Sequence, residues 1–260
     1  SPPLWTHAAQ PKKLRIKMFA RNLHRFKVIT FDCTNTLLYF KVPPSQMYKD
    51  TAIKMGHKSE DFDKNVDMMK SFRNHFKNMS KHHPNFGRKT IGYNLWWTIL
   101  VTALLSEASY HRINQNSCEK IASELIRKYE TDECWAKFNK TDEILRAIKK
   151  EGKIVGVISN IDPRLHNLLE NMKLDDIDFA ITSYETGVQK PNPEIFKHAL
   201  RRAIKRTHPS EFVPVPTIHP HEVLHIGNEL EKDYEGAKSA GFSAVLINSE
   251  NGNYKDIEEF

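Results

Sequence analysis

The chain has 260 residues, enough for one α/β domain with an insertion or for two small domains. Hydrophobic residues make up 39% of it, and no apolar run approaches the roughly 20 residues of a membrane-spanning helix. The three cysteines are scattered, which argues against a disulfide framework and for a reducing compartment. We therefore expect an intracellular protein without a membrane span, in the cytoplasm, with the mitochondrion or the nucleus as alternatives.

The excess positive charge lies at the N-terminal end. The formal net charge is +7, and seven Lys and Arg residues but no acidic residue precede Asp32. The rest of the chain is formally neutral, which argues against a nucleic-acid partner, because a nucleic-acid-binding surface needs clustered cations. Residues 1–24 are predicted to be a basic N-terminal extension. Its amphipathic helical pattern also fits a mitochondrial targeting segment, but we favour a solvated extension.

Beyond the extension, five strand-like segments alternate with helical patterns. They are Val28–Phe31, Ile154–Ser159, Phe179–Ser183, Val223–Ile226 and Ala244–Ile247. One helix is predicted to begin at Asn192-Pro193-Glu194, and another covers about Asp233–Ala240, with Gly241 beyond its end. Strands that alternate with helices predict an α/β fold with a Rossmann-like parallel sheet flanked by helices.

A long segment between the first two strands, residues 42–138, carries helical patterns only. These patterns cover Gln46–Met55, Asp61–Met79, Asn94–Leu105 and Cys118–Tyr129. We interpret the segment as an inserted helical cap folded over the strand ends, so that residues 25–41 and 139–260 form the α/β core. The pair Trp96-Trp97 is expected in a core, because aromatic residues at helical spacing are usually buried.

Asp32 closes the first strand and is followed by a short polar turn, Cys33-Thr34-Asn35-Thr36. Open α/β sheets bind their ligands at the carboxyl ends of the strands, so this carboxylate lies where a site is expected. Cys33 should point away from the site, because side chains alternate along a strand, and we expect a buried thiol there.

Three later segments place polar residues near strand ends. Ser159 and Asn160 offer a hydroxyl, an amide and turn N–H groups that suit a phosphoryl oxygen. Lys190 precedes the helix that begins near Pro193, and an ammonium group beside a helix N-terminus favours a bound anion. Asn228 follows the fourth strand, and Asp233 lies five residues beyond it.

In this order the segments resemble the motifs of the haloacid dehalogenase (HAD) superfamily, from about residue 25 to residue 248. Asp32-x-x-x-Thr36 resembles the nucleophile motif, Lys190-Pro-x-Pro-x-x-Phe the third motif, and Gly227-Asn228 with Asp233 the acidic fourth motif. Within the superfamily, Pro84-Asn85-Phe86-Gly87-Arg88 and Trp96-Trp97 look like the HAD-like hydrolase-domain-containing group three.

The resemblance implies a phosphatase-type hydrolase that forms an aspartyl-phosphate from a small phosphorylated substrate. The catalytic positions that it implies are Asp32, Thr34 and Lys190. The substrate-binding positions that it implies are Thr36, Ser159, Asn160 and Lys190. With Mg²⁺ as the implied cofactor, the metal-binding positions are Asp32, Thr34, Asn228 and Asp233.

Two residues depart from the family pattern. Phosphatases of the superfamily carry a second Asp as general acid and base where this chain has Thr34, and such proton transfer contributes roughly 10²–10⁴-fold. Asn228 replaces an acidic metal ligand with a neutral amide, so we expect weak Mg²⁺ binding. The departures leave two alternatives open: an impaired binding or regulatory protein with this fold, and a metal-free dehalogenase-like hydrolase.

Histidines gather late in the chain, at His208, His219, His221 and His225. Their spacing is not that of a structural zinc site, so we interpret His219-Pro220-His221 as a loop feature.

Overall fold

The computed structural model describes residues 23–207, 217–247, 249–250 and 253–254. Its centre is a sheet of five parallel strands in the order β5-β4-β1-β6-β7. The strands are β1 (Val28–Phe31), β4 (Ile154–Ser159), β5 (Phe179–Thr182), β6 (Val223–Gly227) and β7 (Ser243–Leu246). The predicted α/β class with a parallel sheet is therefore confirmed. The extension predicted over residues 1–24 lies outside the described residues, apart from its last two.

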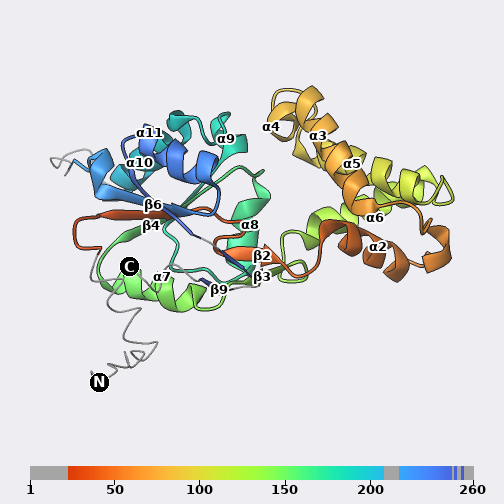
Figure 1. Ribbon diagram of the computed structural model, residues 1–260, viewed down its shortest axis with the longest axis horizontal. Coiled ribbons are helices and arrows are strands. Elements are labelled where there is room, and N and C mark those ends of the chain that lie inside the picture. Colours follow the sequence, from red (N-terminus) through yellow and green to blue (C-terminus); the bar gives the residue numbers. More distant parts are fainter. Residues whose placement is uncertain (1–22, 208–216, 248, 251–252, 255–260) are drawn as a thin grey trace, which may run out of the picture.

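Helices cover both faces of the sheet (Figure 1). On one face, α7 (Thr141–Lys150) and α8 (Arg164–Asn171) share a buried core with Ile29 and Phe31 of β1. On the other face, α10 (Pro193–Thr207) and α11 (Gly236–Ser239) enclose a core that includes Val28. Neighbouring residues of β1 thus point to opposite faces, as the alternation of side chains along a strand requires.

Between β1 and β4 the chain leaves the sheet and forms a second body of helices, which extends to one side of the sheet in Figure 1. We call it the helical insertion. Its helices are α2 (Pro44–Lys54), the 3₁₀ turn η1 (Ser59–Asp61), α3 (Met68–His82), α4 (Pro84–Gly87), α5 (Tyr93–Ala108) and α6 (Gln115–Lys128). They enclose a core of their own around Trp96, which is fully buried. Trp97 is only partly buried and packs at the edge of that core.

A two-stranded antiparallel sheet lies where the chain leaves and re-enters the sheet body. It pairs β2 (Leu38–Phe40) with β3 (Trp135–Lys137). The expectation that residues 42–138 contain helices only is wrong at β3. This strand has three residues, too few to show an alternating pattern, and its pairing partner lies about a hundred residues away in the sequence.

The last third of the chain differs in detail from the prediction. The helix expected over Asp233–Ala240 is instead a π-helical turn, η3 (Leu230–Glu235), followed by the short helix α11. Strand β7 begins one residue before the predicted start, and β5 ends one residue earlier than predicted. The remaining short elements are α9 (Ser183–Thr186), η2 (Pro220–Glu222), β8 (Ser249–Glu250) and β9 (Asn253–Tyr254).

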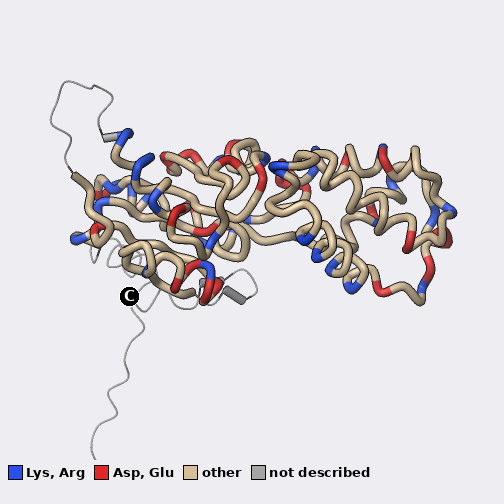
Figure 2. The backbone as a smooth tube through the Cα atoms, turned by 90° about the horizontal axis from the view of Figure 1, so that it is seen from above, with Lys and Arg blue, Asp and Glu red and all other residues tan. Residues whose placement is uncertain are grey.

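Basic and acidic residues are interspersed over the sheet body and the helical insertion (Figure 2). None of the described helices combines the length and the apolar character that a membrane crossing requires.

Candidate functional site

Asp32 lies at the carboxyl end of β1, the central strand of the sheet. Its backbone N–H donates to the carbonyl of Ile226 at 2.9 Å, so pairing with β6 continues one residue past the strand. The side chain is buried, with 6% of the residue exposed. Cys33 is buried behind it, as predicted, and burial together with the charge of Asp32 raises the pKa of this thiol far above its ordinary value.

Lys190 reaches Asp32 from the segment before α10. Its Nζ lies 2.7 Å from Asp32 Oδ1 and 2.5 Å from Asp233 Oδ1, and the residue is 4% exposed. Asn160 holds the backbone of Lys190 on both sides: its Oδ1 accepts from the Lys190 N–H at 2.8 Å, and its Nδ2 donates to the Lys190 carbonyl at 2.9 Å. Asn160, expected to bind substrate, thus also positions Lys190.

Asp233 is placed by η3 against the end of β6. A Cβ at Gly227 would lie 2.3 Å from Asp233 Cγ, so only glycine allows this approach. Asp233 Oδ1 accepts from Lys190 and lies 3.2 Å from His225 Nε2, and Oδ2 accepts from the Glu229 N–H at 3.0 Å. Both carboxylate oxygens are therefore engaged by protein donors.

His225 is a member of the site that the sequence reasoning missed. It is fully buried on β6, and its Nδ1 lies 2.9 Å from the hydroxyl of Thr30, its register partner on β1. Burial and the charge of Lys190 lower the pKa of His225, so its ring is neutral near pH 7, donates from Nε2 to Asp233 and accepts at Nδ1 from Thr30. The available signal was a polar residue one position before the last residue of each predicted strand, Thr30 before Phe31 and His225 before Ile226.

The charges of the cluster shift one another. Burial raises the pKa of Asp32, the charge of Asp233 adds to the shift, and Lys190 opposes it. Burial also disfavours the Lys190 ammonium, but the two carboxylates outweigh burial and raise its pKa. For Asp233, the hydrogen bond from His225 and the charge of Lys190 outweigh burial, so its pKa lies well below the ordinary value. With Asp32 and Asp233 ionised and His225 neutral, the cluster carries one net negative charge.

The remaining predicted residues surround this cluster. The hydroxyl of Thr36 is buried and donates to Asn228 Oδ1 at 3.3 Å, which joins the turn after β1 to the turn after β6. Ser159 is buried at the end of β4, next to β1. Thr34 is partly buried and lies at the start of the same turn as Thr36.

The oxygen donors at the strand ends suit Mg²⁺ in chemical type, but they offer little charge. Nowhere in the described part of the chain do three or more His, Cys, Asp or Glu side chains form a group able to hold a metal ion. Asp233 is engaged on both oxygens and Asn228 Oδ1 accepts one hydrogen bond from Thr36, so the donors that fit are the Asp32 carboxylate, the second lone pair of the Asn228 amide oxygen and an oxygen of Thr34. Mg²⁺ usually binds through one or two carboxylates together with substrate oxygens and water, so this set fits a weakly held ion.

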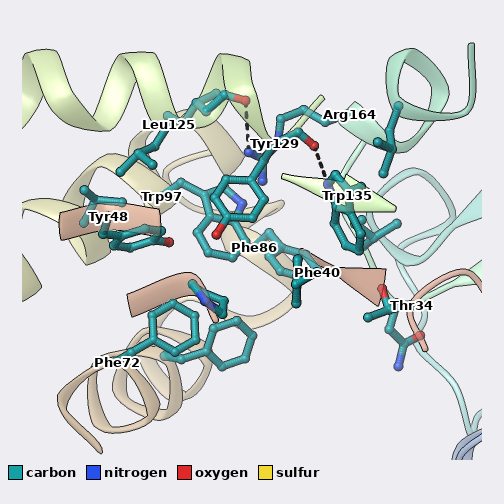
Figure 3. Close-up of a pocket in the computed structure, with 17 residues that line it drawn as sticks. Thr34, Phe40, Tyr48, Phe72, Phe86, Trp97, Leu125, Tyr129, Trp135 and Arg164 are labelled. Carbon is teal, nitrogen blue, oxygen red and sulfur yellow. Dashed lines mark hydrogen bonds between the residues drawn. The ribbon is translucent and has the colours of Figure 1, made fainter. Parts of the chain in front are cut away.

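A cavity of about 250 Å³ lies between the helical insertion and the sheet (Figure 3). On the sheet side its wall includes Thr34 and Asn160, which flank the Asp32–Lys190 pair. On the insertion side the wall is largely aromatic. The aromatic residues there are Tyr48, Phe72, Phe76, Phe86, Trp97 and Tyr129.

The insertion is also joined to the sheet body by hydrogen bonds at α4. Asn85 Nδ2 donates to the carbonyl of Ser183 at 2.8 Å, and the Ser183 hydroxyl donates to Asn85 Oδ1 at 2.9 Å. Asn85 adopts φ 50°, in the left-handed region that asparagine tolerates better than most residues. This reciprocal pair fixes one end of the cavity wall to α9.

A family model described as haloacid dehalogenase-like hydrolase matches residues 26–241. The Rhythmically expressed gene 2 protein of Drosophila melanogaster is 35% identical over 242 residues, 90% of this chain and 87% of that protein. The haloacid dehalogenase-like hydrolase domain-containing protein 3 of Xenopus laevis is 31% identical over 226 residues, 85% of this chain and 84% of that protein. The solved structure of the putative HAD-hydrolase YfnB from Bacillus subtilis, bound to magnesium, has a TM-score of 0.58 at 16% identity, covering 86% of this chain and 89% of that one. This last likeness is one of fold.

Proposed function

Because this chain belongs to the haloacid dehalogenase-like hydrolase family, we propose that it hydrolyses a small phosphate monoester with Asp32 as the nucleophile. One observation carries the proposal: a buried carboxylate at the end of the central strand, ion-paired to Lys190, lies beside a cavity large enough for an organic ligand. The helical insertion would act as the cap that closes over the substrate.

In the first step, a carboxylate oxygen of Asp32 attacks phosphorus, and the bond from phosphorus to the leaving oxygen breaks. This forms an acyl phosphate on Asp32. Water then attacks phosphorus, inorganic phosphate departs, and the Asp32 carboxylate is restored. Lys190 fixes the carboxylate and, with the hydroxyl of Ser159, supplies donors for the phosphoryl oxygens; the hydroxyl of Thr36 would join them by turning away from Asn228.

Electrostatics makes this reaction dependent on a cation. The cluster of Asp32, Asp233 and Lys190 has one net negative charge, and a phosphate monoester brings nearly two more near pH 7. Mg²⁺ held by Asp32, Thr34 and Asn228 would offset this repulsion and supply positive charge to the phosphoryl oxygens. Asp233 is assigned here to positioning Lys190, since both its oxygens are engaged.

Thr34 restricts which phosphate esters can be hydrolysed quickly. Its hydroxyl is neither a useful acid nor a useful base near neutral pH, so the leaving oxygen must take its proton from solvent. Esters whose leaving group is already stable as an anion should therefore react fastest, and the enzyme should be slow with alkyl esters.

The test is Mg²⁺-dependent phosphate release from an aryl phosphate, with wild-type protein and Asp32→Asn compared at equal concentration. Asp32→Asn should fall to background while it still binds a free oxyanion that mimics phosphate, such as tungstate, with reduced affinity. Hydrolysis at the wild-type rate by Asp32→Asn would rule out an aspartyl-phosphate. Metal-independent halide release from a 2-halo acid would instead support the dehalogenase alternative. Binding of the mimic with no turnover of any ester would support the binding-protein alternative.

A further inference from the structure

The cavity beside Asp32 has an unusual combination of an aromatic wall and a single charged residue. Among the described residues that line it, Arg164 alone carries a charge, and that charge is already paired. Arg164 donates from Nε and Nη2 to the two oxygens of Asp162, at 2.8 and 2.7 Å. Asp162 is fully buried, so the ion pair is internal, and the described residues that line the cavity offer no unpaired positive charge to a second anionic group.

The ion pair of Arg164 and Asp162 also helps to order the aromatic wall. The indole N–H of Trp97 donates to Asp162 Oδ2 at 2.8 Å, and the Arg164 guanidinium lies 5.1 Å from the centre of the Trp97 ring. Phe86 stacks on Trp97, with ring centroids 5.9 Å apart and planes inclined by 23°. Ordered ring faces of this kind favour a flat, apolar ligand.

Tyr129 adds one polar group to this wall. Its hydroxyl oxygen is buried and has no hydrogen-bond partner among the described residues, and Figure 3 shows the residue between Tyr48 and Trp135 in the cavity wall. Burial raises the pKa of Tyr129 well above its ordinary value, so the hydroxyl keeps its proton and can donate. A buried hydroxyl without a partner is costly, and a ligand group that bonded to it would remove that cost.

The chemistry at Thr34 points to the same kind of ligand. Thr34 lines the cavity and cannot protonate the leaving oxygen, so a leaving group held in this cavity has to depart as an anion. A phenol ionises near pH 10, far more readily than an alkyl alcohol, and its oxygen departs without an acid. An apolar cavity of ~150 Å³ holds a benzene ring, so the cavity of about 250 Å³ has room for a ring with a substituent.

We propose that the substrate is the monophosphate of a phenol whose ring carries one uncharged hydrogen-bonding substituent, bound by Tyr129. This rests on the proposed phosphatase function and names its substrate class. Sugar phosphates and compounds with a second phosphate are disfavoured, because the described wall of the cavity is mostly apolar and its one cation, Arg164, is already paired.

Binding of phosphonates tests the proposal separately from turnover, because their P–C bond is not hydrolysed. We would measure the affinities of benzylphosphonate, of its meta and para carboxamide derivatives, and of hexylphosphonate by calorimetry with Mg²⁺ present. Benzylphosphonate should bind more tightly than hexylphosphonate, and the better carboxamide should gain a further ~3- to 10-fold, the value of one neutral hydrogen bond. Tyr129→Phe should abolish only that gain, leave benzylphosphonate within twofold, and raise or preserve the melting temperature of the free protein.

Equal affinities for the benzyl and hexyl compounds would overturn the proposal, as would a Tyr129→Phe variant that keeps the carboxamide gain. Turnover then separates the two hypotheses. If phosphonate binding follows the expected order but no ester is hydrolysed, the phosphatase function fails and the ligand class stands. If aryl and alkyl phosphates are hydrolysed with similar kcat/KM and the phosphonates bind alike, the function stands and the ligand class fails.

Discussion

Replacement of Lys190 by methionine tests the buried ion cluster most directly. Methionine keeps an unbranched chain of similar length but leaves Asp32 and Asp233 buried without a cation. Removing one partner from a buried ion pair costs about 3–5 kcal/mol, so we expect the free energy of unfolding at pH 7 to fall by about that amount. Denaturant unfolding, followed by both tryptophan fluorescence and circular dichroism, would measure the loss and test for two-state behaviour.

The loss should depend on pH in a specific direction. Burial already raises the pKa of Asp32, and removal of the ammonium that opposes this shift should raise it further. A carboxyl whose pKa is higher in the folded than in the unfolded protein destabilises the fold when it is ionised. The deficit of Lys190→Met should therefore be largest near pH 7 and shrink as the pH falls towards 5.

Lys197→Met is the matched control, since its side chain is 52% exposed and its partner Glu194 lies 3.5 Å away at the surface. We expect this control to change the free energy of unfolding by less than about 0.5 kcal/mol. In the double variant Lys190→Met/Asp233→Asn, part of the stability should return, because one of the two uncompensated carboxylates is gone. If Lys190→Met behaves like Lys197→Met at pH 7, the buried bridge does not exist and the reasoning is refuted.

Three further predictions concern other parts of the site. Asn228→Asp should lower the Mg²⁺ concentration needed for half-maximal activity, and an unchanged metal dependence would show that Asn228 is not a metal ligand. Thr34→Asp should accelerate the hydrolysis of an alkyl phosphate more than that of an aryl phosphate. Because burial lowers the pKa of His225, the contribution of its neutral ring to stability is complete above about pH 6.5 and is lost as the pH falls below that value. His225→Gln should therefore flatten the fall in melting temperature between pH 7 and 5. Parallel curves of melting temperature against pH for the wild type and the variant would contradict this. Asn85→Ala should lose both hydrogen bonds to Ser183, lower the free energy of unfolding by about 1–3 kcal/mol and raise KM. Asn85→Gly, which keeps the φ of 50° without strain, should raise KM similarly but lower the stability less. An unchanged KM in both variants would show that this contact does not shape the cavity.

Local patterns were enough to predict the sheet and the ends of its strands. Each central strand is a short apolar run, and Asp32 directly follows the first of them, so topology alone puts its carboxylate at the ligand-binding edge. The same reasoning placed Ser159 at the end of a strand, whereas Lys190 and Asp233 were singled out by the resemblance to the HAD motifs. The strands could be predicted because a strand's position and its last residue are properties of a few neighbouring amino acids.

Which of the site residues form ion pairs and hydrogen bonds with one another was decided by the tertiary structure. Lys190 is 158 positions from Asp32 and 43 from Asp233, and no local pattern states that one ammonium group serves both carboxylates. His225 sits in a strand that looks uniformly apolar from its neighbours, and its role depends on the register that sets it beside Thr30. Likewise, the sequence could not show that none of the described residues forms a hydrogen bond with the Tyr129 hydroxyl, because that depends on which groups lie near it in space. The sequence determines which chemical groups lie at a strand end. Packing determines which of these groups bond to one another and which stay available to a ligand.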